Sequence, residues 1–316
     1  MISPYEIIFL IYKFFYSKIQ KEFPFPSICV GSLLIGGAGK TPLGIKIVEK
    51  LINENKKVAV ILRGYKRKIK KDLIIKGEEY SPYEIGDEAY IYLKKFKDKI
   101  IIGLSKKREK IAEEIKKNFD VEIFVFDDAF QYLKYRFSKN IVVLPYKIFL
   151  KKEKFFPFGK LREDYNGIKR ADILVINEKF DYLKEEDKKF IKKILKRFEF
   201  EKNFYFMSYV FKSFKNSKGE IVPLEKIKNK RVFAFCGIGD ANSFFNFLIK
   251  KNIKFEKIKF QDHHFYSKKE ISEIFSKNYD YFITTEKDII KFKEPPDNLI
   301  YPEIDVKIDL NFLNII

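Results

Sequence analysis

The sequence predicts an α/β fold in which a mostly parallel sheet is flanked by helices. Short apolar runs of strand length alternate with longer segments whose apolar residues recur at helical spacing. The first run leads into a glycine-rich segment, which is where such folds turn from strand to helix. Parallel strands need crossover helices on the faces of the sheet, so the alternation itself favours this class. The expected strands are 28–30, 58–62, 100–102, 122–126, 141–144 and 173–176, and the expected helices are 43–53, 88–96 and 107–118.

A second, shorter α/β pattern occupies the last third of the chain, after a charged helical stretch at 184–198. Residues 203–214 are typical of a long strand, and 298–309 of its partner in a β-ribbon. We therefore expect two domains, 1–205 and a smaller 206–316, joined by that ribbon. The elements expected in the second pattern are strands 232–236, 255–260 and 281–284 and helices 243–251 and 268–276.

The composition indicates a folded protein with anionic partners. The 316 residues include 64 Lys and Arg against 44 Asp and Glu, a net charge of +20, and 46% are hydrophobic. This charge favours nucleotides, phosphorylated lipids, membrane surfaces or nucleic acid, unless the lysines merely solvate the surface. Cys29 and Cys236 lie in apolar runs, which indicates buried thiols in a reducing compartment rather than a disulfide framework.

The N-terminal segment 5–19 alternates apolar and basic residues. Its apolar run is too short to span a bilayer, and no secretory signal is evident. Tyr5, Ile8 and Phe15 with Lys13 and Lys18 are typical of an amphipathic helix lying at a membrane surface. An ordinary helix packed on the core is the alternative.

Residues 36–42 read Gly-Gly-Ala-Gly-Lys-Thr-Pro and follow the first strand. Successive glycines let backbone N–H groups converge on phosphate oxygens. Lys40 is placed for the terminal phosphates and Thr41 for Mg²⁺. The standard motif has glycine where Leu34 stands, so a ligand-free turn is the alternative. We predict a P-loop NTPase-like sheet that binds ATP and Mg²⁺. The expected nucleotide contacts are Gly36, Gly37, Ala38, Gly39, Lys40, Thr41 and Pro42.

Two acidic pairs follow the glycine-rich segment along the chain. Asp127 and Asp128 end an apolar strand, where a carboxylate of a P-loop enzyme organises Mg²⁺ or its bound water. Asp87 and Glu88 open a helix, so Asp87 is either a helix cap or a carboxylate that accepts a hydroxyl proton. Spacing alone favours the cap.

The two histidines of the chain, His263 and His264, are adjacent and follow Asp262. A catalytic or substrate-binding role suits a residue that titrates near neutrality. A surface position and a Zn²⁺ site are the alternatives, although neighbouring side chains rarely face one metal. The segment Thr284–Asp288 can be a helix cap with charged first-turn residues.

Three arginines follow expected strands or lie in a loop. Arg63 and Arg108 come just after strands, hence near the expected site, and Arg162 with Glu163 lies in a loop after Pro157. Arginine in these places suits phosphate binding, and for Arg162 beside Glu163 a salt bridge is the alternative.

Nine segments in this order together resemble the tetraacyldisaccharide 4′-kinase family, which phosphorylates a lipid A precursor. They span residues 28–291. In order, the segments are GGAGKTP, LRGYKRK, GDEA, VFDDAFQ, FGKLRE, ADILVIN, FCGIGDANSFF, DHH and TTEKD.

The resemblance implies transfer of the ATP γ-phosphate to the 4′-hydroxyl of an acylated glucosamine disaccharide 1-phosphate. It also implies a peripheral protein at the cytoplasmic face of the bacterial inner membrane, with Mg²⁺ and with no nucleic-acid or obligate protein partner. It overturns the cap-only interpretation of Asp87, which is expected to act with His263, although His264 is not excluded. The implied roles are catalysis for Asp87, His263, Lys40 and Asp128; metal binding for Thr41, Glu88, Asp127 and Asp128; and substrate or phosphate contact for Arg63, Arg108, Arg162, Glu163 and His264.

The sequence departs from the family pattern in several loops, which puts loop geometry and acyl-chain preference in question. Ser32, Lys66, Ala129, Tyr132 and Asp240 stand where the family has other residues.

Two other functions are compatible with parts of the sequence. A partitioning or assembly ATPase shares the compact glycine-rich loop but carries a lysine where Ile35 stands. A nucleic-acid-binding protein suits the positive charge, yet the chain has no groove-reading motif.

Overall fold

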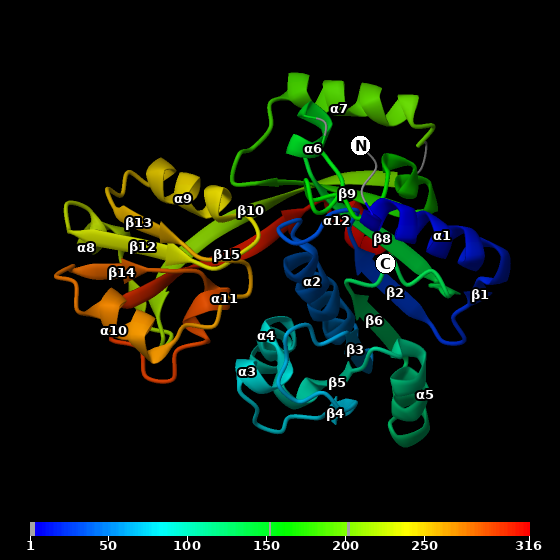
Figure 1. Cartoon of the computed structure of the whole chain (residues 1–316), viewed down its shortest axis with the longest axis horizontal. Helices are drawn as coiled ribbons and strands as arrows, with labels where there is room; N and C mark the ends of the chain where they lie inside the picture. The colour runs from blue at the N-terminus through cyan, green and yellow to red at the C-terminus, as the bar shows by residue number, and fades with distance from the viewer. Residues whose placement is uncertain (1–3, 152, 201–202) are drawn as a thin grey trace.

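The computed structural model describes residues 4–151, 153–200 and 203–316, and these form an extended sheet with helices on both faces (Figure 1). Thirteen strands of the described chain belong to that sheet, and most of its strand pairs are parallel. The predicted α/β class with a mostly parallel sheet is confirmed. Its strands run in the order β13-β12-β14-β15-β10-β9-β8-β2-β6-β3-β5-β4, with β11 paired to β10.

The N-terminal half supplies the larger part of the sheet, and β4 is its antiparallel edge strand. Every predicted strand of this half is present, within about three residues of its expected ends. The predicted strands are β2 (Ser27–Gly31), β3 (Val58–Leu62), β5 (Ile100–Leu104), β6 (Ile123–Asp127), β8 (Lys139–Pro145) and β9 (Ile173–Lys179). The edge strand β4 (Leu73–Ile75) was not predicted.

Alternation of side chains divides this half into two cores. In β3, Ala59 and Ile61 point to one face while Val58 and Val60 point to the other. The first face is covered by α5 (Arg108–Asn118), α6 (Lys147–Leu150) and α7 (Glu185–Arg197). The second is covered by α2 (Lys40–Asn53), α4 (Asp87–Phe96) and α12 (Leu310–Asn314). The short helices α3 (Pro82–Ile85), η1 (Lys97–Lys99) and η2 (Tyr165–Arg170) complete this half.

The C-terminal half repeats the arrangement on a smaller scale. Its parallel strands are β12 (Val232–Cys236), β13 (Glu256–Lys259) and β14 (Tyr281–Ile283). Phenylalanines of α9 (Ala241–Lys250) cover one face, and α10 (Lys268–Phe275) with α11 (Glu286–Ile289) covers the other. The short helix α8 (Leu224–Ile227) packs Ile227 into the same core as the phenylalanines of α9.

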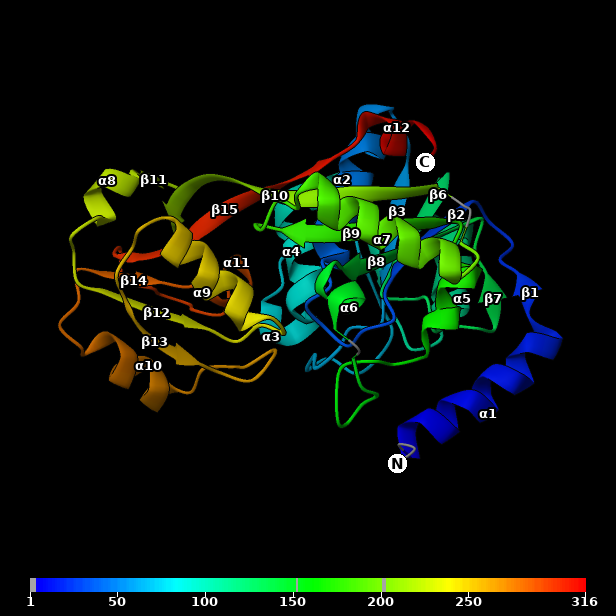
Figure 2. The same ribbon diagram turned by 90° about the horizontal axis from the view of Figure 1, so that it is seen from above.

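A long ribbon connects the two halves. β10 (Asn203–Asn216) pairs in parallel with β9 over its first residues and antiparallel with β15 (Leu299–Ile308) over most of its length. Figure 2 shows β10 and β15 crossing from one half to the other. The short β11 (Ile221–Val222) pairs with the far end of β10. The division near residue 205 remains our proposal, since β10 itself runs through it.

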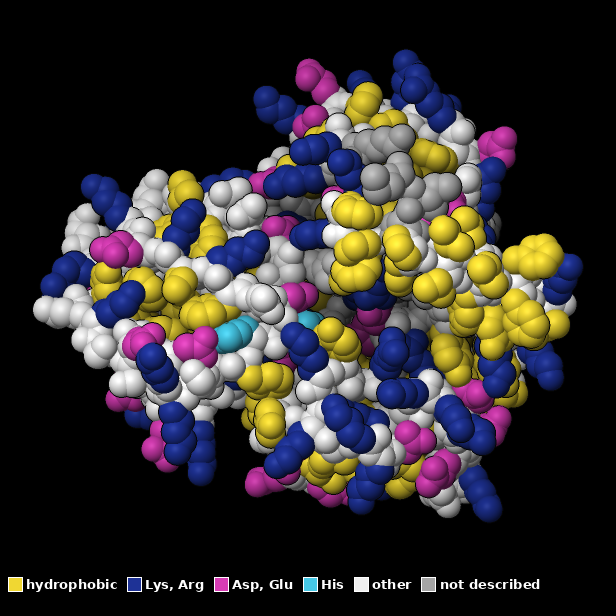
Figure 3. All heavy atoms as spheres, in the orientation of Figure 1, with side chains coloured by type: hydrophobic (Ala, Val, Ile, Leu, Met, Phe, Trp, Pro, Cys, Tyr) yellow, Lys and Arg dark blue, Asp and Glu magenta, His cyan; other side chains and the backbone are white. Residues whose placement is uncertain are grey.

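The N-terminal helix α1 (Pro4–Ile19) lies at the rim of the larger half, followed by β1 (Lys21–Glu22), which pairs with β7 (Tyr135–Arg136) (Figure 2). Phe9 is buried, but most large apolar side chains of α1 face outward, unlike those of a core helix. Figure 3 shows them as a hydrophobic surface. No described helix has the length and apolar character needed to cross a bilayer. The exposed side chains are Ile7, Ile8, Leu10, Ile11, Phe14, Phe15 and Ile19.

Candidate active site

The glycine-rich loop leaves β2 and turns into α2, as predicted. Gly36, Gly37 and Gly39 all have positive φ, and Gly39 at 101° is the residue that caps α2. A Cβ at Gly39 would collide with the side-chain amide of Asn177, which donates to the carbonyl of Ala38 (2.9 Å). Close packing therefore fixes the loop at the point where Lys40 begins the helix.

The position at which the standard motif has glycine is occupied by a core residue. Leu34 is 5% exposed and forms an isolated β-bridge with Leu161. The N–H of Ile35 donates to the carbonyl of Lys160 (2.8 Å), and the N–H of Arg162 to that of Leu33 (2.7 Å). The loop that carries Arg162 thus braces the entry to the phosphate loop.

Asp128, directly after β6, is contacted by three positively charged side chains. Arg162 makes two hydrogen bonds to its carboxylate (2.7 and 2.9 Å), and Lys40 Nζ lies 3.3 Å from Oδ1. Arg108 donates to the Asp128 carbonyl (2.9 Å). The partly buried position of this carboxyl opposes ionisation, but Lys40 and Arg162 outweigh it and hold its pKa well below the ordinary value.

The neighbouring Asp127 is buried and lacks such partners. The residue is 3% exposed, and neither carboxylate oxygen has a hydrogen bond of good geometry within the described chain, although the hydroxyl groups of Thr41 and Tyr92 lie beside it. Burial, with the negative charges of Asp128 and Glu88, raises the pKa of Asp127 to about 6. A buried carboxylate with both oxygens unused fits a bound cation.

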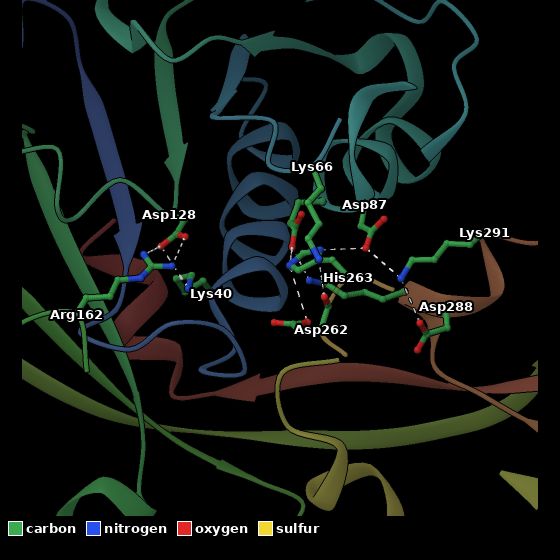
Figure 4. A network of polar contacts seen from close by, with 11 residues as sticks. Lys40, Lys66, Asp87, Asp128, Arg162, Asp262, His263, Asp288 and Lys291 are labelled. Atoms are coloured by element: carbon green, nitrogen blue, oxygen red, sulfur yellow. Dashed lines mark hydrogen bonds and ion pairs between the residues drawn. The ribbon is translucent and has the colours of Figure 1, made fainter. Parts of the chain in front are cut away.

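Asp87 and His263 meet across the two halves of the molecule (Figure 4). Asp87 begins α4 and is 2% exposed, and His263 lies in the loop after β13. His263 Nδ1 is 3.1 Å from Asp87 Oδ2, and Asp87 Oδ1 has no partner within the described chain. Of the two histidines, His263 is therefore the one that pairs with Asp87.

Glu88 forms a second link between the halves. Its Oε1 accepts from Lys287 Nζ of α11 (2.6 Å) and lies 3.6 Å from His263 Nε2. Burial disfavours the ionised form of Glu88, but Lys287 and His263 reverse this and lower its pKa to about 2. In turn, the charge of Glu88 raises the pKa of Lys287 despite burial of the ammonium group.

The phosphate loop, Asp127, Asp128 and His263 border one cavity of about 1150 Å³. Asp262 Oδ2 would lie 2.7 Å from a Cβ at Gly36, so the C-terminal half also reaches the phosphate loop. Figure 3 shows charged side chains of both signs in the hollow beside the hydrophobic surface of α1. Further expected site residues that line the cavity are Arg63, Arg108, Arg162 and Glu88, and α1 contributes Tyr5, Ile8 and Tyr12.

Three expected site residues are not among the described residues that line the cavity. Asp87 is 2% exposed and is linked to the cavity through His263. Glu163 is completely buried and accepts from Arg170 (2.8 Å) and Gln131 (2.8 Å). Within the described chain, the salt bridge of Arg162 is made with Asp128 and not with Glu163. His264 stacks on Phe260 and lies 3.0 Å from Glu270, beside a smaller cavity of about 460 Å³.

Sequence reasoning missed two lysines that contact the acidic pair at the start of α4. Lys287 lies in the segment interpreted as a helix cap, and no sequence pattern singles out Lys291. In the structure they pair with Glu88 and Asp87 respectively. The signal available was that a lysine-rich turn directly follows a strand of the second α/β pattern.

Comparison with known proteins identifies the family. A family model described as tetraacyldisaccharide-1-P 4′-kinase matches residues 4–316. The tetraacyldisaccharide 4′-kinase of Aquifex aeolicus is 34% identical over 281 residues, which cover 86% of this chain and 81% of that protein. Its counterpart from Flavobacterium johnsoniae is 30% identical over 295 residues, covering 92% and 85%.

A solved structure agrees with these sequence matches. The crystal structure of LpxK from Aquifex aeolicus in complex with ATP has a TM-score of 0.74 and 31% identity to this chain. The match covers 98% of this chain and 95% of that one, which confirms the predicted P-loop kinase type of fold. The chain therefore belongs to the tetraacyldisaccharide-1-P 4′-kinase family.

Proposed function

We propose that this kinase binds ATP at the loop 36–42 and transfers its γ-phosphoryl group to the 4′-hydroxyl of an acylated glucosamine disaccharide 1-phosphate. Family membership supports the reaction, and the ATP complex of the Aquifex aeolicus relative supports the donor. The observation that carries the site assignment is the contact between the buried Asp87 and His263, since His263 lines the same cavity as Lys40.

The donor side of the site is rich in positive charge. Lys40 and the backbone N–H groups of residues 36–41 would bind the phosphates, and Pro42 in the first turn of α2 removes no needed donor. Arg162 and Lys40 are paired with Asp128, so they are already oriented before nucleotide arrives. Arg63 and Arg108 add charge that would stabilise the transferring phosphoryl group.

Mg²⁺ fits the residues at the end of β6. We assign Asp127 and Thr41 as its main protein ligands, because Asp127 has two unpartnered buried oxygens and Thr41 begins the adjacent helix. Asp128 and Glu88 would contribute charge or a bound water. No group of three His, Cys, Asp or Glu side chains among the described residues is arranged for a metal, but Mg²⁺ commonly uses one or two carboxylates and the phosphates. When bound, Mg²⁺ neutralises charge on the β- and γ-phosphates.

On the acceptor side, Asp87 and His263 orient and deprotonate the sugar hydroxyl. Asp87 Oδ2 holds His263 through Nδ1, and of the two residues it is His263 that lines the cavity and would meet the hydroxyl. Glu163 supports Arg162 through Gln131, which donates to Glu163 and accepts from Arg162. His264 supports the 261–264 loop through Glu270. The proton thus leaves the hydroxyl as its oxygen attacks phosphorus.

We expect the acyl chains of the substrate to bind along the apolar side of the cavity. Tyr5, Ile8 and Tyr12 of α1 line it, and the outward face of the same helix is apolar and flanked by Lys13 and Lys18. We propose that α1 lies at the cytoplasmic surface of the inner membrane, where this chemistry favours anionic lipid headgroups. The lipid substrate then reaches the site without leaving that surface.

The test compares variants of the dyad in a transfer assay with ATP and disaccharide 1-phosphate. Asp87→Ala and His263→Ala should each lower kcat by about 10²- to 10⁴-fold, the usual contribution of general-base groups, while nucleotide affinity is retained. Glu79→Ala removes an exposed carboxylate that does not line the cavity and should leave kcat unchanged. Wild-type turnover in both dyad variants would overturn the assignment.

A further inference from the structure

A buried lysine lies directly behind the dyad. The side chain of Lys291, just after α11, is 1% exposed, and its Nζ lies 3.2 Å from both Asp87 Oδ2 and Asp288 Oδ1. Burying an ammonium group without partners is costly, so this position requires both carboxylates. Neither Lys291 nor Asp288 is among the described residues that line the cavity.

The far end of this arrangement is anchored to the C-terminal half. Asp288 is completely buried, and its Oδ2 accepts from the N–H of Gly237 (3.0 Å) and from Thr285 Oγ1 (2.6 Å). Gly237 follows β12 and Thr285 precedes α11. Asp288 is therefore held by two elements and has little freedom to follow a movement of Lys291.

At the near end, Asp87 Oδ2 is shared by two donors. Lys291 Nζ approaches it at 3.2 Å and His263 Nδ1 at 3.1 Å, which leaves Oδ1 without a partner. With Oδ2 held twice, the carboxylate cannot rotate about its own axis without breaking both contacts. His263 Nε2 is then directed towards Glu88 at the cavity wall, 3.6 Å away.

We propose that Lys291, anchored by Asp288, is a positioning residue that fixes the carboxylate of Asp87 and, through it, the ring of His263. Figure 4 shows the resulting chain of contacts from His263 through Asp87 and Lys291 to Asp288. The inference rests on the proposed function of Asp87 and His263. It gives the charged residues after β14 a role in the acceptor site. Lys287 and Lys291 each hold one carboxylate at the start of α4 in place.

The test compares Lys291→Met with Lys293→Met, which removes an exposed lysine two residues away. Lys291→Met should lower kcat by about tenfold to a hundredfold with the KM for ATP unchanged, because small displacements of reacting groups have effects of this size. Lys293→Met should behave as wild type.

Imidazole ¹⁵N spectra report positioning independently of turnover. The chain has two histidines, so both rings can be followed, and His264, held by Glu270, serves as an internal reference. In Lys291→Met the ¹⁵N signals of His263 should shift while those of His264 stay in place. A loss of activity with unshifted His263 signals contradicts positioning through Asp87.

Loss of folding is separated from loss of positioning by the double variant Lys291→Met/Asp288→Asn, which removes one buried charge of each sign. The same fall in kcat and the same shift of the His263 signals are expected in the double variant.

Wild-type kcat with unshifted His263 signals in either folded variant overturns the inference. If Asp87→Ala and His263→Ala lose turnover but Lys291→Met does not, this inference alone fails; if the dyad variants also keep full turnover, the proposed function of the dyad fails as well.

Discussion

Asp127 and Asp128 are adjacent in sequence, yet their surroundings drive their ionisation in opposite directions. Burial raises the pKa of Asp127 to about 6, whereas Lys40 and Arg162 hold that of Asp128 well below its ordinary value. The difference follows from the pleat of β6 and the turn after it, which send one carboxylate inward and the other towards the cations. Asp127 is thus suited to a cation, and Asp128 to orienting the groups that meet phosphate.

The geometry of Arg162 gives a prediction at this scale. Its guanidinium makes two hydrogen bonds to Asp128, and a lysine ammonium cannot reproduce both. Arg162→Lys should therefore lower kcat by about tenfold, corresponding to about 1.4 kcal/mol of lost transition-state stabilisation. Steady-state kinetics with saturating ATP measures the effect. Arg197→Lys, an exposed arginine on α7, is the matched control, and equal kcat values for the two variants would contradict the role of the paired guanidinium.

Among single residues, the sequence predicted those whose neighbours in the chain form a motif. Lys40, Thr41, Asp127 and Asp128 sit in short patterns tied to strand ends, and the structure brings them to one cavity. Lys291 contacts Asp87, about two hundred positions earlier in the chain, and no local pattern encodes a partner at that separation.

The phosphate loop shows how an element depends on close packing as well as on backbone freedom. Gly39 and Gly219 both have positive φ, but only Gly39 is surrounded by side chains; nothing lies within 4 Å of a Cβ at Gly219. A substitution at Gly219 therefore tests backbone strain alone, whereas one at Gly39 tests backbone strain together with steric collision.

Gly39→Ala should lower ATP affinity by about a hundredfold or more, because the added Cβ displaces Asn177 and the start of α2 moves with it. Gly219→Ala should cost about 1 kcal/mol of stability and leave ATP affinity unchanged. Isothermal titration with ATP and thermal unfolding distinguish the two effects. Comparable ATP affinity in both variants would refute the packing argument.

A second element-scale feature is the contact between α9 and the loop after β9. Asp181 accepts from Lys250 at the end of α9 (2.8 Å) and from Tyr146 (2.9 Å), and Lys147 lies 3.1 Å away. Burial opposes ionisation of Asp181, but these hydrogen bonds prevail and lower its pKa to about 2. Because the folded pKa lies below the unfolded value, this stabilisation is complete above about pH 4 and is lost as the pH falls towards 2.

Asp181→Asn should accordingly reduce the free energy of unfolding by about 1–2 kcal/mol at pH 7, a figure that allows for 24% exposure of the side chain. The difference from wild type should persist to about pH 4.5 and shrink below about pH 4. Urea titrations at several pH values measure it, with the exposed Glu186→Gln as control. A difference that stays constant down to about pH 3 would contradict this account.

At the scale of the whole molecule, the acceptor site exists only where the two halves meet. α4 of the N-terminal half supplies Asp87 and Glu88, while the C-terminal half supplies His263, Lys287 and Lys291. β10 and β15 set the distance between the halves, since both strands run through the shared sheet. The strand order and the ribbon follow from the hydrophobic pattern. The distance between the two halves does not follow from the hydrophobic pattern. It depends on contacts between residues far apart in the chain, such as the approach of Asp262 to Gly36.

The apolar face of α1 predicts how the whole molecule binds to a membrane surface. Ile11 and Phe14 are each 65% exposed, and burying one such side chain is worth about 1.5–3 kcal/mol. Ile11→Ser/Phe14→Ser should reduce binding to vesicles containing anionic phospholipid by about tenfold or more. Phe190→Ser, which removes an exposed phenylalanine of α7, should leave binding unchanged. Equal co-sedimentation of the two variants would place the membrane contact elsewhere.

The central claim is that the cavity joins a nucleotide site to an acceptor site for a lipid sugar. The most direct measurement is the mass and phosphate position of the lipid product after incubation with ATP, Mg²⁺ and acylated disaccharide 1-phosphate. The account predicts a lipid that gains one phosphoryl group, located at the 4′-oxygen, in amounts equal to the ADP formed. ADP and free phosphate with an unchanged lipid would contradict it.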